Sequence, residues 1–437
     1  MAEKKSIGTI LRENAVTVMF VLLCILCMVY SGQSVQYVIY ELFGRLSRNA
    51  FIVLALIIPI IAGMGVNFAI TIGAMAAQVA MLWVVEWDVP GIGGWLLAAL
   101  MTVPLAGFFG FLIGKLMNKM KGQEMIGGMI LGYFANGLYQ LLFLFIFGNL
   151  IPLTTPGLVI KGSTGVANTI DLSYSRSGSG GIAGALDKLW RVDFATALYM
   201  AAGILLLAAI ALFFIKPKHY KAGDKGLNKN QKKSLLMAAV AVLCVVVYQI
   251  PFVKDLFTLV RVPIVTFLVV ALLCVFNTAL MSTRLGQQFR AVGQNRTVAN
   301  AAGINVDRVR VIAIIISTIL AGWGQLIFVQ NMGTFQTYGA HEQVGLYAGA
   351  AILVGGASIR KATNGQAILG CILFHLLFIV CPGAGKTLFG DAQIGEYFRV
   401  FISYGVIALA LVMHAWSSHQ AKKPGAELRA GQSEKKA

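Results

Sequence analysis

The main shortage in this sequence is of charged residues. Only 12% of its 437 residues are Asp, Glu, Lys or Arg, while 58% are hydrophobic. Soluble globular domains have about a quarter of their residues charged and less than half of them apolar. Disordered chains have low hydrophobicity. The composition excludes both classes and favours membrane spans of roughly 20 apolar residues each.

Acidic residues are missing from the middle of every apolar run. All 17 lie in loops, in tails or at the edges of these runs. An ionisable group at the bilayer centre costs on the order of 3 kcal/mol and is retained for tasks such as proton relay. The sequence therefore argues against a proton-coupled carrier. The deep titratable candidate is His375, for which a packed core histidine is the simpler interpretation.

The sequence also lacks the patterns of a metal or nucleotide site. All six cysteines, including Cys24 and Cys27, lie within or at the ends of apolar runs, which is typical of small buried side chains. The segment 382–387 resembles a phosphate-binding loop, but Val380 replaces a required small residue and an apolar helix precedes the segment. We expect no catalytic residue, metal or cofactor in this chain.

The apolar runs are numerous, and two regions of them are broken. Pro59, Gly63 and Gly65 interrupt one region, and Gly355 with Gly356 ends another. Such breaks occur at membrane depth where protein or a water-filled cavity satisfies the backbone, so both indicate a pathway. We predict an all-α, polytopic membrane protein with about 10–12 transmembrane or re-entrant helices. An internal pseudo-repeat is a further hypothesis. The runs span about 15–30, 50–66, 68–86, 95–117, 125–147, 194–215, 235–251, 262–281, 309–330, 341–357, 365–381 and 397–416.

Basic residues are shared unequally between alternate loops. The net charge is +18, and an inside N-terminus places 25 of the 35 Lys and Arg in inside loops. Cytoplasmic loops of membrane proteins carry such an excess, which accounts for the charge without nucleic acid. We therefore expect both termini in the cytoplasm. The predicted regions are tails at 1–14 and 417–437, a transmembrane domain at 15–416, an outside loop at 148–193 and a basic inside loop at 216–234.

The long outside loop and the polar residues within the runs each allow two interpretations. The loop at 148–193 is too polar to cross the membrane, and is either a docking surface or an exposed insertion. Asn67, Gln78 and Asn136 lie in or beside the broken segments of the first half. Polar side chains there bond across helices or line a polar path, and we take these three as pathway candidates.

The segment 284–310 is the most informative part of the chain. Asn295 is a good helix N-cap, the following residues are rich in alanine, and Gly303 suits a left-handed C-cap. This predicts a helix of roughly two turns lying across a loop between two spans. Since an isolated helix of that length is unstable in water, it needs a partner surface.

The same segment resembles the coupling loop of bacterial ABC importer permeases of the ribose/simple-sugar and branched-chain amino acid type. The likeness rests on Ala291, Gly293, Asn295, Ala299 and the run 303–306, with further similarity at 320–322, 355–358 and 63–65. In that family the loop forms a coupling helix seated in a cleft of a cytoplasmic ATPase. The resemblance implies coupling roles for Arg290, Gly293, Asn295, Ala299 and Gly303.

One residue departs from the family pattern. Arg296 stands where the family more often has a small or acidic residue, so we expect partner contacts at this position to differ.

The resemblance also implies the partners and the location. A separate cytoplasmic ABC ATPase would bind the ATP, an extracytoplasmic binding protein would deliver the solute, and a second permease subunit would complete the path. The subunit would span the bacterial cytoplasmic membrane among its lipids. The nearly charge-free interior favours a neutral polar solute, with a simple sugar first, a nucleoside second and an amino acid third. A sodium-coupled secondary carrier or a structural membrane protein remains the alternative of another class.

Overall fold

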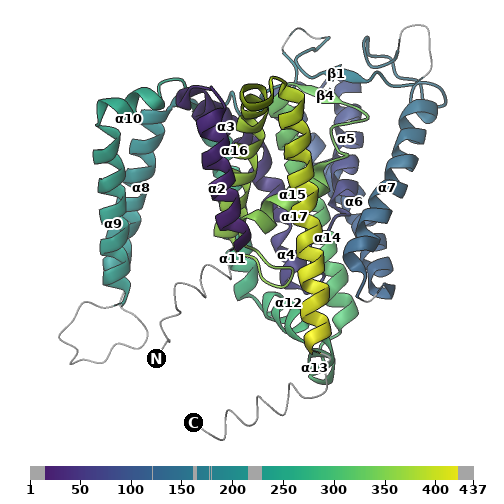
Figure 1. Ribbon diagram of the computed structural model, residues 1–437. Helices are drawn as coiled ribbons and strands as arrows, with labels where there is room; N and C mark the ends of the chain where they lie inside the picture. The colour runs from purple at the N-terminus through teal and green to yellow at the C-terminus, as the bar shows by residue number, and fades with distance from the viewer. Residues whose placement is uncertain are drawn as a thin grey trace, which may run out of the picture.

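The computed structural model describes residues 15–120, 122–160, 165–176, 178, 180–214 and 229–421, and these residues are mostly helical (Figure 1). Within them, eight helices are long and apolar enough to cross a membrane, and three shorter helices are also apolar. The predicted fold class, an all-α multi-span membrane protein, is confirmed. The internal pseudo-repeat remains a prediction.

In chain order, the helices are α2 (Ala15–Tyr30), α3 (Val35–Ala55), α4 (Ile57–Ile61), α5 (Ile70–Glu86), α6 (Gly91–Lys119), α7 (Glu124–Leu141), the π-helical turn η1 (Leu142–Ile146), α8 (Phe194–Phe214), α9 (Lys229–Tyr248), α10 (Pro251–Leu256), α11 (Ile264–Ser282), α12 (Arg284–Gln294), α13 (Arg296–Ala301), α14 (Val306–Met332), α15 (Val344–Val354), α16 (Asn364–Phe389) and α17 (Ala392–Ala421).

Three helices begin or end beyond the apolar runs of the sequence. Helix α3 begins at Val35 rather than near residue 50, because Ser34 caps it by accepting from the Tyr37 N–H, and its first turns are polar. Helix α9 begins at Lys229, inside the expected basic loop, and α17 continues to Ala421, into the expected tail. The rest of that basic loop up to residue 228, and both tails apart from 417–421, lie outside the described residues.

The two predicted breaks are confirmed at their glycines, whereas Pro59 lies inside α4. Helix α4 ends before Gly63 and Gly65, whose φ angles of 75° and 71° are left-handed, and α5 begins only at Ile70. Glycine adopts this conformation without the penalty that other residues meet. Helix α15 ends at Gly355, and Gly356, with φ of 83°, turns the chain toward α16.

Helix α14 occupies the centre of the bundle, where it packs along α3, α5 and α6. The approach is close because glycines face it: a Cβ on Gly73 would lie 2.2 Å from Thr318 O, and one on Gly114 would lie 2.9 Å from Val311 Cα. Small residues allow helices in membranes to approach this closely. Two further groups pack together, one of α2, α15, α16 and α17 and the other of α8 and α9.

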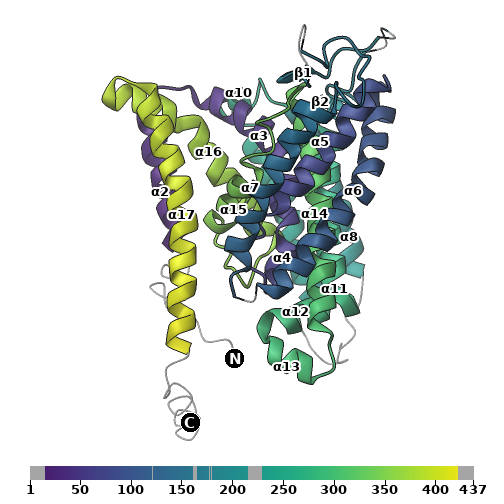
Figure 2. The ribbon, with the colours of Figure 1, turned by 90° about the vertical axis from the view of Figure 1, so that its right-hand side faces the viewer.

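The molecule has two distinct ends (Figures 1 and 2). At one, called here the α13 end, α12 and α13 connect α11 to α14. At the other, called the strand end, β1 (Thr169–Asp171) pairs antiparallel with β4 (Thr334–Gln336), and β2 (Arg191–Asp193) with β3 (Arg261–Pro263). The described part of the 148–193 segment therefore packs onto the bundle through both short sheets.

Candidate functional site

The segment that carries the family resemblance folds locally as predicted. Asn295 Oδ1 accepts hydrogen bonds from the N–H groups of Thr297 (2.9 Å) and Val298 (3.2 Å), which makes it the N-cap of α13. Gly303 follows the helix with a left-handed φ of 80°, and Asn305 caps α14. The short helix, its N-cap and its glycine end are confirmed.

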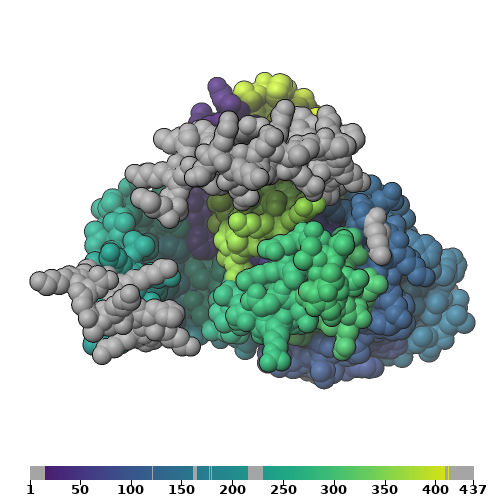
Figure 3. All heavy atoms as spheres, turned by 90° about the horizontal axis from the view of Figure 1, so that it is seen from below, coloured from purple at the N-terminus to yellow at the C-terminus, as the bar shows by residue number. Residues whose placement is uncertain are grey.

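The coupling candidates divide between the surface and the interior. Figure 3 looks onto the α13 end, where the green atoms of α12 and α13 lie at the surface. Arg290 and Asn295 are exposed there, and Val298 presents an apolar side chain that is 63% exposed. Ala299 is only 3% exposed, and Gly293 is half-buried against the body. These two residues can influence a partner only through the packing of the segment.

Gly293 joins the coupling segment to the break between α4 and α5. A Cβ on Gly293 would lie 2.1 Å from Ile61 O, and a Cβ on Gly63 would lie 2.7 Å from Gly293 Cα. The guanidinium of Arg296 donates to Gly63 O at 2.9 Å. Only glycine at both positions permits this backbone-to-backbone contact, so the coupling segment and the break must move together or separate.

Glu124, in the first turn of α7, forms ion pairs with two arginines. Its Oε1 lies 2.8 Å from Arg296 Nη2 and 2.5 Å from Arg310 Nη2, and its Oε2 accepts from the Gly122 N–H at 2.9 Å. Arg310 is fully buried and Glu124 is 6% exposed. A buried charge requires a partner of this kind. Arg296, the departure from the family pattern, thus ties the coupling segment to α7 and to the break.

Asn67 lies within the break, where it supports the start of α5. Its Oδ1 accepts from the Ala69 N–H at 3.1 Å, and the side chain is 1% exposed. Its Nδ2 has no hydrogen-bond partner in the described part of the chain.

Gln78 and Asn136 are brought together by a histidine that the sequence analysis did not select. His341 Nδ1 lies 2.7 Å from Gln78 Oε1, and His341 Nε2 lies 2.8 Å from Asn136 Oδ1. The Tyr139 hydroxyl donates to Gln78 Oε1 at 2.9 Å, and Asn136 Nδ2 donates to Glu342 at 3.2 Å. This set, called here the His341 network, joins α5 and α7 to the segment before α15.

His341, at the centre of the network, is kept uncharged by its burial. The His341 side chain is fully buried, and this lowers the pKa of its imidazole to about 4. The ring is therefore neutral near pH 7 and donates through one nitrogen only, so one of the two amides that face it, Gln78 or Asn136, presents its nitrogen rather than its oxygen to the ring. The network consists of uncharged groups except at its edge, where Glu342 is exposed.

Two pockets flank the segment that carries His341. One, of about 230 Å³, is lined by Phe68, Thr71, Asn136 and Glu342 with their neighbours. The other, of about 280 Å³, lies between α3, α14, α15 and α16 and also reaches Glu342. His375 lines the second pocket, and its Nδ1 has no partner among the described residues, so it is buried but not hydrogen-bonded through that atom.

Comparison with known proteins identifies the family. A family model described as "Branched-chain amino acid transport system / permease component" matches residues 38–412. The chain belongs to this permease family. The resemblance inferred from the coupling segment is thus confirmed, because the family is described as a permease component of a transport system. No solved structure matches the chain.

A curated relative supports the same assignment over part of the permease. The "Probable ABC transporter permease protein YphD" of Escherichia coli (strain K12) is 27% identical over 162 residues. That match covers 37% of this chain and 47% of the relative, so the chain spans about half the length of the relative it matches.

Sequence reasoning missed the charged and aromatic partners of the sites it proposed. His341 and Glu342 lie at the edge of an apolar run. The one sequence signal for them is that they directly precede α15, a helix about half as long as a membrane span. The sequence analysis counted Arg310 among the basic residues of the inside loops, yet its side chain is fully buried. Its partner Glu124 is 186 positions away in the chain, beyond the reach of any local pattern.

Proposed function

We propose that this permease is the transmembrane subunit of an ATP-driven ABC importer for a small neutral polar solute, a simple sugar first. One observation carries the proposal: the exposed α12–α13 segment is joined through Gly293 and Arg296 to a break in a membrane helix. A segment that is both exposed at one end and fixed to a broken span is suited to passing movement from a partner into the bundle.

The coupling steps follow from the contacts. An ATPase that docks on α13 would meet Val298 and the exposed side chains around it. Displacement of α13 would act through Arg296 on Gly63 and on Glu124, which begin or precede α5 and α7. Those two helices carry Gln78 and Asn136, so movement at the α13 end would alter the His341 network.

The His341 network is the part of the permease best suited to a neutral solute. Its amides, imidazole and phenol supply uncharged donors and acceptors, and Tyr139 stacks on Phe143 with ring centroids 4.2 Å apart. Sites of this kind orient polar ligands with few, well-placed groups. Sugar hydroxyls both donate and accept and would exchange with these bonds. A nucleoside offers hydroxyls too and remains an alternative.

A branched-chain amino acid is a further candidate solute. The description of the matching family names this class, and Glu342 lies on both pockets beside the network. Its carboxylate could pair with an α-ammonium group, which a sugar lacks.

The proposed partners follow the family resemblance. They are a cytoplasmic ATPase on the α13 end, an extracytoplasmic solute-binding protein at the strand end, and a second permease copy or a related chain. Helix α2 starts and α17 ends toward the α13 end in Figure 1, which fits cytoplasmic termini in a bacterial cytoplasmic membrane.

Reconstitution tests the proposal. The permease is isolated from its native membrane with its associated proteins and reconstituted in liposomes. It should accumulate labelled ribose only when ATP is supplied on the side of the membrane that carries the ATPase. Replacement of ribose by labelled leucine or uridine identifies the solute class. Uptake by the permease alone, driven by a sodium gradient without ATP, would instead establish the secondary carrier.

A further inference from the structure

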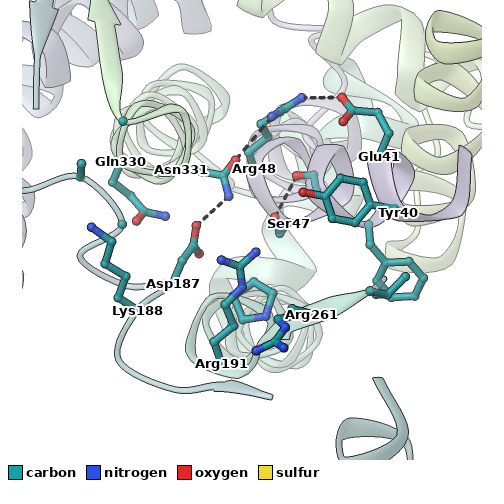
Figure 4. Close-up of a pocket in the computed structure, with 17 residues that line it drawn as sticks. Tyr40, Glu41, Ser47, Arg48, Asp187, Lys188, Arg191, Arg261, Gln330 and Asn331 are labelled. Atoms are coloured by element: carbon teal, nitrogen blue, oxygen red, sulfur yellow. Dashed lines mark hydrogen bonds and ion pairs between the residues drawn. The ribbon is translucent and has the colours of Figure 1, made fainter. Parts of the chain in front are cut away.

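A further cavity, separate from the two pockets beside the His341 network, lies at the strand end. It has a volume of about 410 Å³ and is bounded by α3, the 183–191 segment, β3 and the end of α14 (Figure 4). Its lining includes four basic side chains and two acidic ones. They are Arg48, Lys188, Arg191, Arg261, Glu41 and Asp187.

The acidic residues of this cavity are already engaged. Asp187 accepts from Asn331 Nδ2 at 2.6 Å and from the Thr266 hydroxyl. Glu41 lies 3.0 Å from Arg45 and 3.4 Å from Arg48. Figure 4 shows the Arg48, Asn331 and Asp187 side chains joined in this way along one wall.

Lys188 and Arg191 have no comparable partners. In the part of the chain that the structure describes, neither lies within 4.0 Å of a carboxylate, and both are exposed. Among the described residues, the carboxylate near Arg261 is that of Asp193, at 3.7 Å, and both of those side chains are more than half exposed. The cavity therefore carries a positive excess that its own acids do not neutralise.

A buried amide points to a ligand independently of the charges. Gln330, near the end of α14, lines the cavity and is fully buried. Its Oε1 accepts from the Leu186 N–H at 3.3 Å, while its Nε2 has no hydrogen-bond partner among the described residues. A buried donor without an acceptor is unfavourable, so an acceptor group within the cavity would stabilise this N–H.

We propose that this cavity binds a phosphate group, carried by a phospholipid headgroup or present as free phosphate. The available groups are donors and cations, namely Lys188, Arg191, Arg261 and Gln330 Nε2, so the complementary ligand is an anion rich in acceptors. Guanidinium groups match phosphate oxygens in pairs, and lysine adds a point charge. The site does not depend on the transported solute, which we propose to be neutral.

The position suits a headgroup. The candidate spans α8 and α11 begin directly after β2 and β3, and α14 ends beside the cavity. Tyr40 and Phe43 of α3 also line it, and aromatic side chains concentrate at the boundary of the bilayer. A bound phosphate would link the end of α14 to α3 and to the 183–191 segment.

Calorimetric titration of the full-length permease in neutral detergent tests this site. The two ligands are inorganic phosphate and dioctanoyl phosphatidylglycerol, with dioctanoylglycerol as the lipid lacking phosphate. Saturable binding of either phosphate ligand, and none of dioctanoylglycerol, supports the site. If both bind at similar affinity, the site recognises the phosphate group itself. If the lipid alone binds, the site recognises a phospholipid headgroup.

Variants assign the binding to this cavity. Lys188→Gln with Arg191→Gln should weaken it at least tenfold, as should Gln330→Glu, which keeps the acceptor for Leu186 but removes the donor. Lys254→Gln, a basic residue of α10 outside the cavity, should leave affinity unchanged. Thermal unfolding checks that each variant is folded.

The proposal is overturned if neither phosphate ligand binds, or if the cavity variants and the Lys254 variant bind alike. A cavity that binds neither ligand, but whose variants lose stimulation by the solute-binding protein, is instead a docking point for an acidic protein surface.

Discussion

Two interruptions between helices of this permease, at 62–69 and at 333–343, are satisfied in different ways. The first, between α4 and α5, is stabilised by backbone contacts with Gly293 and by the ion cluster of Glu124 with Arg296 and Arg310. The second, between α14 and α15, carries β4 and the neutral His341 network. A break fixed by charge and close backbone contact suits transmission of movement, whereas one surrounded by uncharged polar groups suits contact with a solute.

The largest expected effect comes from removing the charge that stabilises the first break. Glu124→Gln leaves Arg310 buried without a carboxylate, which costs about 3–5 kcal/mol. We expect a lower unfolding temperature and loss of transport. The matched control is Asp193→Asn, which breaks a solvent-exposed pair with Arg261 and should cost less than about 1 kcal/mol. Equal stability of the two variants would show that the buried cluster is not important.

The next effect tests the glycine contact. Gly293→Ala places a methyl group 2.1 Å from Ile61 O and should cost about 1–3 kcal/mol, because backbone must shift. Transport should fall more than ATPase association does, since the contact to the break is altered while the exposed face of α13 remains. Gly137→Ala on α7, where a Cβ meets nothing within 4 Å, is the control for helix glycines. Normal transport by Gly293→Ala would mean that the contact is not part of coupling.

The interruption at 333–343 is tested by Asn136→Leu. The substitution removes a partner of His341 and of Glu342, so transport should fall about tenfold, the equivalent of about 1.4 kcal/mol, while assembly with the ATPase is retained. Gln140→Leu, on the same helix, should transport normally. Full transport by Asn136→Leu would remove this residue from the pathway.

The smallest effect is expected at the end of α13. Gly303→Val forces a β-branched residue into φ of 80°, although no atom lies within 4 Å of the added Cβ. ATPase affinity should fall a few-fold. Gly303→Asn, which tolerates the left-handed conformation, should restore it. If valine and asparagine behave alike, the backbone conformation at this position does not matter for docking.

The sequence predicted those features that depend on neighbouring residues. The N-cap at Asn295, the glycine end at Gly303 and the break at Gly63 and Gly65 are all local, and all are confirmed. The start of α3 was missed because its polar turns resemble a loop, and only the Ser34 cap marks it.

Features that join distant segments were beyond sequence reasoning. The Gln78–His341 and Glu124–Arg310 contacts depend on how α5, α7 and α14 pack, which no local pattern encodes. The same reason explains Ala299, which was chosen as a coupling residue but faces the body, whereas Val298 faces outward.

The central claim is that an ATPase docks on the exposed face of α13, and Val298→Asp tests it most directly. This exposed position tolerates a charge without disturbing the core, so the unfolding temperature should stay unchanged. Tagged wild-type permease, purified gently from its native membrane, should retain an ATPase in stoichiometric amount, and the variant should lose it. Equal recovery of the ATPase with both proteins, or recovery with neither while transport persists, would contradict the account.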